Sequence, residues 1–168
     1  MKVSVIIPVY NMANGCVQRC LDSLVQQTVL KRQIADLEII CVDDCSTDNS
    51  LEIMKVYEEK FKNTIFVYHL ETNRKQGGAR NFGFLKSTGD YICYVDADDY
   101  VSPEFVEKLL NKAIASNAEV VNCNLCRTHE FSFEYDVKDA TDYRFSRFLF
   151  GFYFKETACF AKRRYSCY

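Results

Sequence analysis

Two aspartates, Asp96 and Asp98, follow directly after the apolar run from Tyr91 to Val95. The run is rich in aromatic and β-branched residues, which predicts a buried strand that ends where the carboxylates begin. While the backbone stays extended, side chains two positions apart project from the same face, and hard divalent cations prefer oxygen ligands. The spacing therefore favours carboxylates that lie near a metal ion. The competing interpretation is a polar turn that only closes the strand.

Polar residues also follow other predicted strands at the point where each strand must end. They are Tyr10 and Asn11 after residues 3–9, Asp43 and Asp44 after residues 37–42, and Arg80 in the helix that follows residues 64–70. Neighbouring carboxylates repel one another, and a bound cation is the usual way to offset this repulsion. Ligands of open α/β sheets bind at the carboxyl ends of the strands. We therefore expect these residues to form one ligand site.

The elements that must position these residues alternate between strand and helix. Nearly continuous β-branched runs predict strands that are covered on both faces, and the order predicts an α/β fold with a Rossmann-like, mostly parallel sheet flanked by helices. Right-handed crossovers then place the carboxyl ends of the strands along one edge. The predicted strands are residues 3–9, 37–42, 64–70, 91–95 and 118–123, and the predicted helices run over about 15–27, 49–61 and 103–117, with a further helix that ends near residue 87.

Proline and glycine residues set several of the expected boundaries. Pro8 has no N–H to donate, so pairing of the first strand is expected to end there. Pro103, with the preceding serine as a cap, suits the first turn of a helix. In the polar segment of residues 72–83, the glycine pair at 77–78 would let the backbone approach a ligand, and the start of the following helix would favour an anion. The same glycines would equally permit a tight turn, because the segment has no Gly-x-Gly-x-x-Gly pattern.

The size and charge of the chain limit the number of domains and the kinds of partner that it can have. The sequence has 168 residues, which fits one domain with a real core, and a formal net charge of −2 with both signs interspersed. It shows no basic footprint of the kind that binds phosphate backbones, so we expect no nucleic-acid partner. Met1 and Lys2 directly precede a predicted strand, which leaves no room for a signal peptide and predicts a cytoplasmic protein. No apolar run is long enough to cross a bilayer.

The nine cysteines are then expected to be reduced and mostly buried as small apolar side chains. Cys123 and Cys126 alone have the spacing of a metal or redox pair. Such a site would need a second pair of ligands, which neither His69 nor His129 obviously supplies.

The composition changes after residue 125. Residues 143–154 are dense in aromatic side chains, and residues 162–164 form a small basic cluster. We interpret the aromatic residues as core or interface, and the alternative is contact with a membrane surface, a partner or a second copy of the chain. The expected division is a core of residues 1–125 and an atypical tail of residues 126–168.

Four segments resemble, in the same order, the motifs of the family 2 glycosyltransferases with the GT-A fold. They are residues 3–11 (VSVIIPVYN), 42–50 (VDDCSTDNS), 78–83 (GARNFG) and 96–99 (DADD). The resemblance covers roughly residues 1–125, and four motifs in matching strand and helix context make it specific. It implies a nucleotide-sugar-binding core with the GT-A fold, followed by an incomplete acceptor region.

The resemblance implies transfer of a sugar from a nucleotide-diphosphate donor to an acceptor hydroxyl, usually with inversion and with Mg²⁺ or Mn²⁺, as in polysaccharide biosynthesis. The acceptor would be a saccharide or a lipid-linked molecule. In the resemblance, Tyr10 would stack on the donor base beside Pro8, and Asp44 would accept the base N–H in a pocket that Asp43 helps to shape. Arg80 would contact the base and the diphosphate. Asp96 would contact the ribose and the diphosphate, and Asp98 would coordinate the metal.

The catalytic base is not identified. Family members usually supply it from an acidic pair well beyond the Asp-x-Asp, and none of the later acidic residues stands in such a pair. These residues are Glu130, Glu134, Asp136, Asp139, Asp142 and Glu156. The chain therefore resembles the donor-binding half of such an enzyme, and the alternative is a truncated, non-catalytic module that binds a nucleotide sugar.

Two other α/β classes fit less well. A sugar-phosphate nucleotidyltransferase would need a glycine-rich basic loop after the first strand, but residues 10–15 contain no lysine or arginine. A phosphate-accepting receiver domain would need its acidic pair after the first strand and a lone aspartate after the third. Here the acidic residues follow the second and fourth predicted strands.

Overall fold

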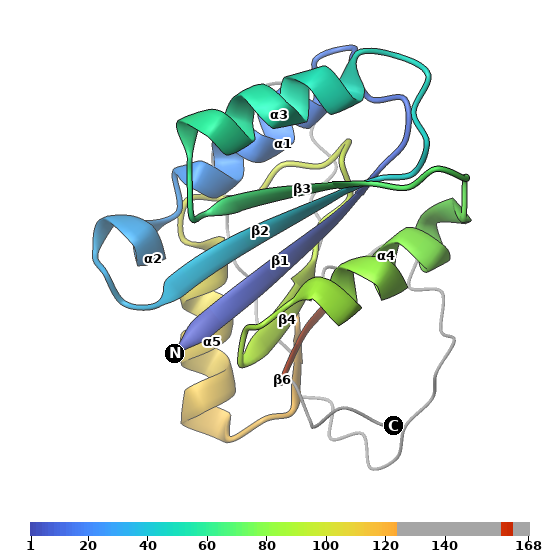
Figure 1. Cartoon of the computed structure of the whole chain (residues 1–168). Coiled ribbons are helices and arrows are strands. Elements are labelled where there is room, and N and C mark those ends of the chain that lie inside the picture. The colour runs from blue at the N-terminus through green and yellow to red at the C-terminus, as the bar shows by residue number, and fades with distance from the viewer. Residues whose placement is uncertain (124–158, 163–168) are drawn as a thin grey trace.

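The computed structural model describes residues 1–123 and 159–162. In this part of the chain a six-stranded sheet, with the order β3-β2-β1-β4-β6-β5, carries helices on both faces (Figure 1). The strands are β1 (Lys2–Val9), β2 (Asp36–Asp43), β3 (Ile65–His69), β4 (Tyr91–Tyr94), β5 (Val120–Asn122) and β6 (Cys159–Lys162). The predicted strands are confirmed, and β6 is an additional strand from the C-terminal part of the chain.

The first four strands form a parallel sheet. β1 pairs with β2 on one side and with β4 on the other, and β2 pairs with β3. The register aligns Val9 with Asp43 and Asp43 with His69, so the carboxyl ends of β1, β2 and β3 lie side by side. β6 runs antiparallel between β4 and β5. The mostly parallel sheet expected from the sequence is therefore confirmed.

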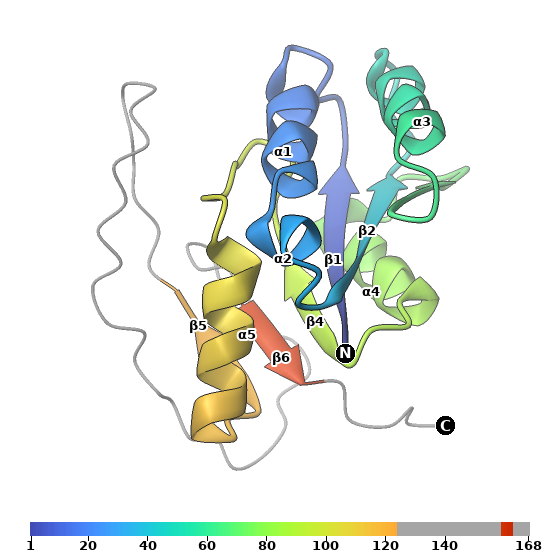
Figure 2. The ribbon, with the colours of Figure 1, turned by 90° about the vertical axis from the view of Figure 1, so that its left-hand side faces the viewer.

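The helices divide unequally between the two faces of the sheet. They are α1 (Cys16–Val25), α2 (Thr28–Lys31), α3 (Ser50–Lys60), α4 (Lys75–Lys86) and α5 (Phe105–Ser116). Side chains of α1, α2, α3 and α5 pack with Val3, Val5, Ile7 and Val9 of β1 in one cluster, whereas α4 packs with Ile6 in another. Figure 2 shows α1 and α5 on one side of the sheet and α4 on the other. Period-two alternation along β1 thus supplies an apolar surface to both layers.

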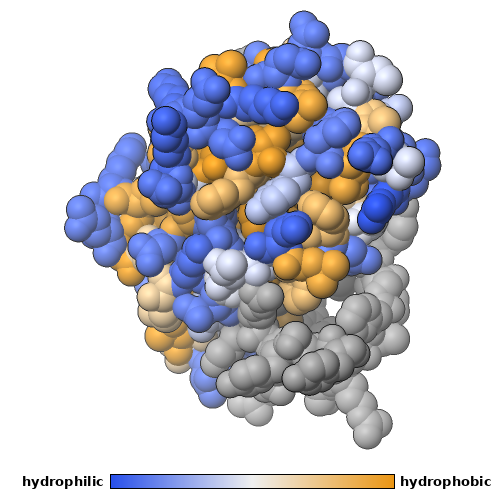
Figure 3. Space-filling model, viewed as in Figure 1, coloured by the Kyte–Doolittle hydropathy of each residue, from blue (hydrophilic) through white to orange (hydrophobic). Residues whose placement is uncertain are grey.

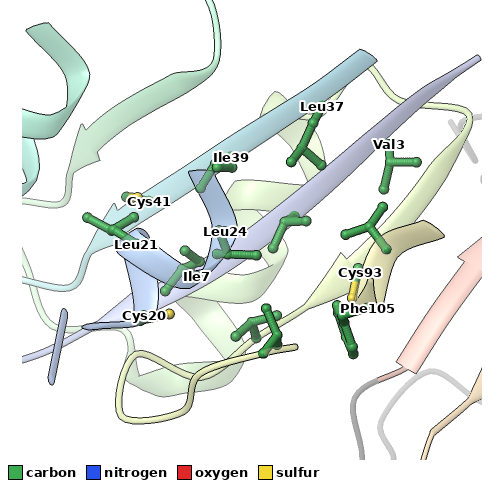
Figure 4. Close-up of a cluster of buried hydrophobic side chains, with 14 of the residues drawn as sticks. Val3, Ile7, Cys20, Leu21, Leu24, Leu37, Ile39, Cys41, Cys93 and Phe105 are labelled. Carbon is green, nitrogen blue, oxygen red and sulfur yellow. The ribbon is translucent and has the colours of Figure 1, made fainter. Parts of the chain in front are cut away.

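The larger cluster is a closely packed apolar core (Figure 4). Ile7 of β1 and Leu24 of α1 are both fully buried in it. Cys20, Cys41 and Cys93 are buried in the same cluster, as expected for small apolar side chains. Burial raises the pKa of the Cys20 and Cys41 thiols, so both stay protonated at neutral pH.

The expected end of pairing at Pro8 is wrong, because β1 continues to Val9. Val9 O accepts from Asp44 N on the β2 side, whereas Ile6 O accepts from Val95 N on the β4 side. The backbone N–H and C=O groups of even-numbered residues in β1 therefore point towards β4, and the pairing of β4 with β1 ends at Ile6. The missing N–H of Pro8 lies where no partner strand needs it, so the proline costs no ladder bond.

The expected start of a helix at Pro103 is also wrong. α5 begins at Phe105, two residues later than Pro103. Phe105 N donates to Ser102 O, and Pro103 O accepts from Thr28 N, so these residues form a turn that joins α2 to α5. A local sequence pattern cannot reveal that the Pro103 carbonyl accepts a hydrogen bond from a residue as distant in sequence as Thr28.

No helix in the described residues is long and apolar enough to cross a membrane. On the face that carries α4, hydrophobic side chains are interspersed with hydrophilic ones (Figure 3). Leu85 of α4 and Val56 of α3 are among the exposed large apolar residues. Single exposed apolar side chains are ordinary on folded proteins and indicate no particular function.

Candidate functional site

The loops that follow β1 and β2 are fastened to each other at the carboxyl edge of the sheet. Asn11 N donates to Ser46 Oγ at 3.0 Å, and Thr47 N donates to Asn11 Oδ1 at 2.8 Å. Asp44 N donates to Val9 O at 2.8 Å. The residues expected after the first two strands are therefore brought together.

Asp44 lies under the loop that follows β3. Its Oδ1 accepts from Arg74 N at 2.6 Å, and its backbone carbonyl accepts from Asn73 Nδ2 at 3.2 Å. Asp44 is 3% exposed, whereas Tyr10, at the end of the neighbouring strand, is 47% exposed. An accessible aromatic ring thus lies at the same edge as a carboxylate held by one backbone hydrogen bond, an arrangement suited to a flat polar ring.

Asp43 supports this edge from beneath. The residue is fully buried, and its Oδ2 lies 2.7 Å from His69 Nδ1 and accepts from Ser46 N at 3.3 Å. Its Oδ1 has no hydrogen-bond partner among the described residues. Asp43 therefore links the ends of β2 and β3 to the loop that follows β2. Its contribution to the site is to hold His69 and Ser46 in place.

Asp96 is already paired with a basic residue. Its Oδ1 accepts from Arg80 NH2 at 2.6 Å and from Gln76 Nε2 at 2.9 Å. The Arg80 guanidinium also lies 5.7 Å from the centroid of the Tyr94 ring. The sequence predicted that Arg80 and Asp96 would meet at one edge, but it did not predict that they would form an ion pair, and it missed Gln76.

Asp98 differs from Asp96 in both exposure and partners. Its side chain is exposed and makes no hydrogen bond or ion pair with residues 1–123. Asp99 N donates to Asp96 O at 3.0 Å, which closes the turn that carries both residues. Of the two aspartates, Asp98 is thus the one whose carboxylate is available to an outside cation.

The acidic turn of residues 96–99 carries three carboxylates that influence one another. Desolvation, followed by the charges of Asp98 and Asp96, raises the pKa of Asp99, and the nearby Arg19 partly offsets this rise. The charges of Asp96 and Asp98 therefore reach Asp99, and a bound cation is one way to offset repulsion among such carboxylates.

Strained backbone surrounds Asp44. Positive φ angles occur at Asn11 (55°) and Cys45 (63°) in loops at this edge, and at Lys75 (62°), the first residue of α4. Asparagine tolerates the left-handed region, but cysteine and lysine do so at a cost of about 1–2 kcal/mol each. Gln33 and Asn63 at the opposite edge also have positive φ angles, so backbone strain by itself does not mark the site. Nothing in the residue types of Cys45 or Lys75 could have predicted it.

Within the described residues no three His, Cys, Asp or Glu side chains come together as a metal cage. Mg²⁺ does not require one, because it keeps several waters and takes one or two carboxylates together with substrate phosphates. A single exposed carboxylate at Asp98 fits that coordination.

The first turn of α4 contains Gly77 and Gly78 and lies at the same edge. The glycine pair therefore stands in the start of a helix and not in a loop, which corrects its expected position.

Comparison with known proteins decides the family. The sequence matches the family model described as "Glycosyl transferase family 2" over residues 4–165. The chain belongs to glycosyl transferase family 2. A poly(ribitol-phosphate) beta-glucosyltransferase from Bacillus spizizenii is 39% identical over 120 residues, which are 71% of this chain and 18% of the relative. The uncharacterized glycosyltransferase YibD from Escherichia coli is 41% identical over 123 residues, which are 73% of this chain and 33% of the relative.

Solved structures of the family share the fold. TarS from Staphylococcus aureus superposes with a TM-score of 0.63 at 34% identity, over 71% of this chain and 34% of that chain. TarS has also been solved with UDP and with UDP-GlcNAc. A mannosyltransferase from Pyrobaculum calidifontis, in complex with GDP-Man and Mn²⁺, gives a TM-score of 0.64 at 22% identity, which shows a common fold alone. The GT-A fold expected from the sequence is confirmed, and the chain spans about a third or less of the length of these two relatives and of TarS.

Several expectations fall outside the described residues. They concern the separate tail of residues 126–168 apart from β6, its membrane or dimer contact, Cys126 as the partner of Cys123, and the six acidic candidates for the catalytic base. These expectations remain predictions.

Proposed function

We propose that this chain binds a uridine-diphosphate sugar as the donor part of a metal-dependent, inverting glycosyltransferase. Two neighbouring side chains carry the proposal: Asp96 is held by Arg80, and the Asp98 carboxylate is exposed and has no hydrogen-bond or ion-pair partner in residues 1–123. UDP is the proposed nucleotide because TarS, which is 33% identical in its UDP complex, binds it.

Each predicted residue then has a role that its surroundings support. The exposed ring of Tyr10 would stack on uracil at the strand end formed by Pro8, and Asp44, kept in place by Arg74 N and Asp43, would accept the base N–H. Arg80 would hold Asp96 toward the ribose and add positive charge near the diphosphate.

The chemical step is a single displacement. The acceptor hydroxyl oxygen bonds to the anomeric carbon as the bond from that carbon to the diphosphate oxygen breaks; the bonding pair leaves with UDP, and the hydroxyl proton goes to a base. Asp98 would hold Mg²⁺ or Mn²⁺, which when bound offsets the charge that develops on the leaving diphosphate. The base is not identified among the described residues, and the proposed acceptor is a saccharide or a lipid-linked molecule.

A second candidate is a module that binds the nucleotide sugar without turning it over. Its support is that the expected donor-site residues lie within the described part of the chain, whereas the acidic candidates for the base all lie outside it. Release of UDP from UDP-glucose or UDP-GlcNAc by the full chain, with water or an added saccharide as acceptor, would exclude this candidate.

Calorimetric titration of the chain with UDP, in Mn²⁺ and in EDTA, tests the donor site. We expect about tenfold tighter binding in Mn²⁺, equivalent to about 1.4 kcal/mol, and loss of this difference in Asp98→Asn. The matched control is Asp36→Asn, an exposed aspartate at the amino end of β2, which should keep the metal effect. Equal binding in Mn²⁺ and EDTA by the unaltered chain would contradict the proposal.

A further inference from the structure

One face of α1 and its continuation fasten the acidic turn to the body of the protein. Four side chains take part, and they lie at helical spacing. The contacts are Arg19 NH2 to Asp98 O at 3.4 Å, Cys20 Sγ to Asp96 O at 3.6 Å, Val101 N to Ser23 Oγ at 3.1 Å, and Gln27 Nε2 to Ser102 O at 2.7 Å. The segment of residues 96–102 is therefore held at four points by side chains from residues 19–27, none of which is a carboxylate.

Arg19 occupies the end of this row nearest the exposed carboxylate. Its guanidinium donates to the backbone carbonyl of Asp98 and lies 5.0 Å from the centroid of the Tyr100 ring. It thus contacts the turn on both sides of Asp99. A planar guanidinium that donates and stacks at once fixes direction more firmly than a point charge does.

The Asp98 side chain makes no hydrogen bond within the described chain, so the direction of its carboxylate depends on the backbone that carries it. Asp96 is different, because Arg80 and Gln76 hold its carboxylate directly. The structure therefore has two arginines from two helices at the turn, one that acts on a side chain and one that acts on a backbone.

We propose that Arg19 is a positioning residue for Asp98, which holds the turn so that the carboxylate meets the divalent cation of the donor complex. The proposal rests on the proposed function, because it assumes a cation at Asp98. In this proposal α1 takes part in metal binding indirectly, through Arg19, and not through a carboxylate of its own.

Two other roles for Arg19 predict different results. If Arg19 only competed with the cation through its charge, its removal would tighten metal binding. If Arg19 only stabilised the fold, its removal would lower the unfolding temperature and leave metal binding unchanged, since Ser23 and Gln27 would still hold the turn. A positioning role predicts weaker metal binding.

The test is the Mn²⁺ concentration that half-saturates the metal-dependent binding of UDP to the full chain. In Arg19→Met, which keeps the apolar stem, we expect this concentration to rise about fivefold, because the charge-assisted contact with the Asp98 carbonyl is among those lost. UDP affinity in EDTA should stay within about twofold. Arg19→Lys keeps the charge but not the planar fork, so it should give a smaller rise and serves if Arg19→Met does not fold.

Arg32→Met is the matched control, because Arg32 pairs with Glu107 away from the turn and its loss should leave the half-saturating Mn²⁺ unchanged. An unchanged or lower value in both Arg19 variants, with the unaltered chain still metal-dependent, would overturn this proposal alone. Metal-independent UDP binding by the unaltered chain would overturn the proposed function and this proposal with it.

Discussion

At the scale of single residues, Asp96 and Asp98 show how neighbours of one type acquire different chemistry. The strand end and the period of two are local features, so the sequence could predict that both reach one edge. It could not predict the partner of Asp96, because Arg80 lies 16 residues earlier and meets it only after α4 has packed on the sheet. The result is one neutralised carboxylate and one that is free to take a cation.

The buried carboxylate of Glu38 gives a prediction at the same scale. Glu38 accepts from Ser4 Oγ at 2.5 Å and from Thr88 Oγ1 at 2.8 Å, and it forms an ion pair with Lys2 at 2.5 Å. Burial on its own would raise the pKa of Glu38, but the hydrogen bonds from Lys2, Ser4 and Thr88 lower it to about 2. Since the folded-state pKa lies below the ordinary value of 4.5, the stabilisation is complete above that pH and is lost as the pH falls towards 2.

We therefore expect Glu38→Gln to lower the free energy of unfolding by about 2 kcal/mol at pH 7 and by clearly less near pH 3. Urea denaturation at the two pH values measures this difference. Glu52→Gln, at an exposed position in the first turn of α3, is the control and should change stability little at either pH. A loss in Glu38→Gln that is the same at both pH values would show that the charge of Glu38 is not the cause.

At the scale of elements, α4 packs on the core near its C-terminal end and lies at the candidate site with its first turn. Near its C-terminal end, a Cβ at Gly83 would lie 2.4 Å from Ile6 Cγ2 and 3.2 Å from Val42 Cγ2. In its first turn, a Cβ at Gly77 would meet nothing within 4 Å. The glycine in the last turns thus allows close packing on the sheet, while the one in the first turn leaves open space at the carboxyl edge.

We expect Gly83→Ala to destabilise the fold by about 1–3 kcal/mol through overpacking. Gly77→Ala in the same helix is the matched variant, and it should stabilise by about 0.5–1 kcal/mol because alanine favours helix. Thermal and urea denaturation of both variants measure the contrast. Similar stability in the two variants would contradict the packing of α4 against β1.

Some elements could be predicted from sequence and others could not. The apolar runs of β1 and β2 and the helical spacing in α1 are local patterns, and each gave its element nearly in full. β6 has four residues and gains its structure from pairing with β4 and β5, so no local pattern indicates it. Likewise α2 and the late start of α5 depend on the contact between Thr28 and Pro103.

At the scale of the whole molecule, the two edges of the parallel sheet differ in chemistry. At the amino edge lies an open hollow of about 610 Å³, lined by residues that include Lys2, Ile34 and Asn63. Lys2 is already paired with Glu38, and the lining contains no pair of carboxylates. At the carboxyl edge the chain gathers Tyr10, Asp44 and the acidic turn, so we place the donor site there despite the hollow at the opposite edge.

The most direct test of this placement is the broadening of backbone amide signals by substoichiometric Mn²⁺ in the isotope-labelled chain with UDP present. We predict that signals from residues 10–11, 44–46, 74–78 and 96–100 broaden first, and that those near Lys2 and Asn63 stay sharp. Diamagnetic Mg²⁺ is the control and should leave the line widths unchanged. Broadening centred on the amino edge, or none at all while UDP is bound, would contradict a metal and donor site at the carboxyl ends of the strands.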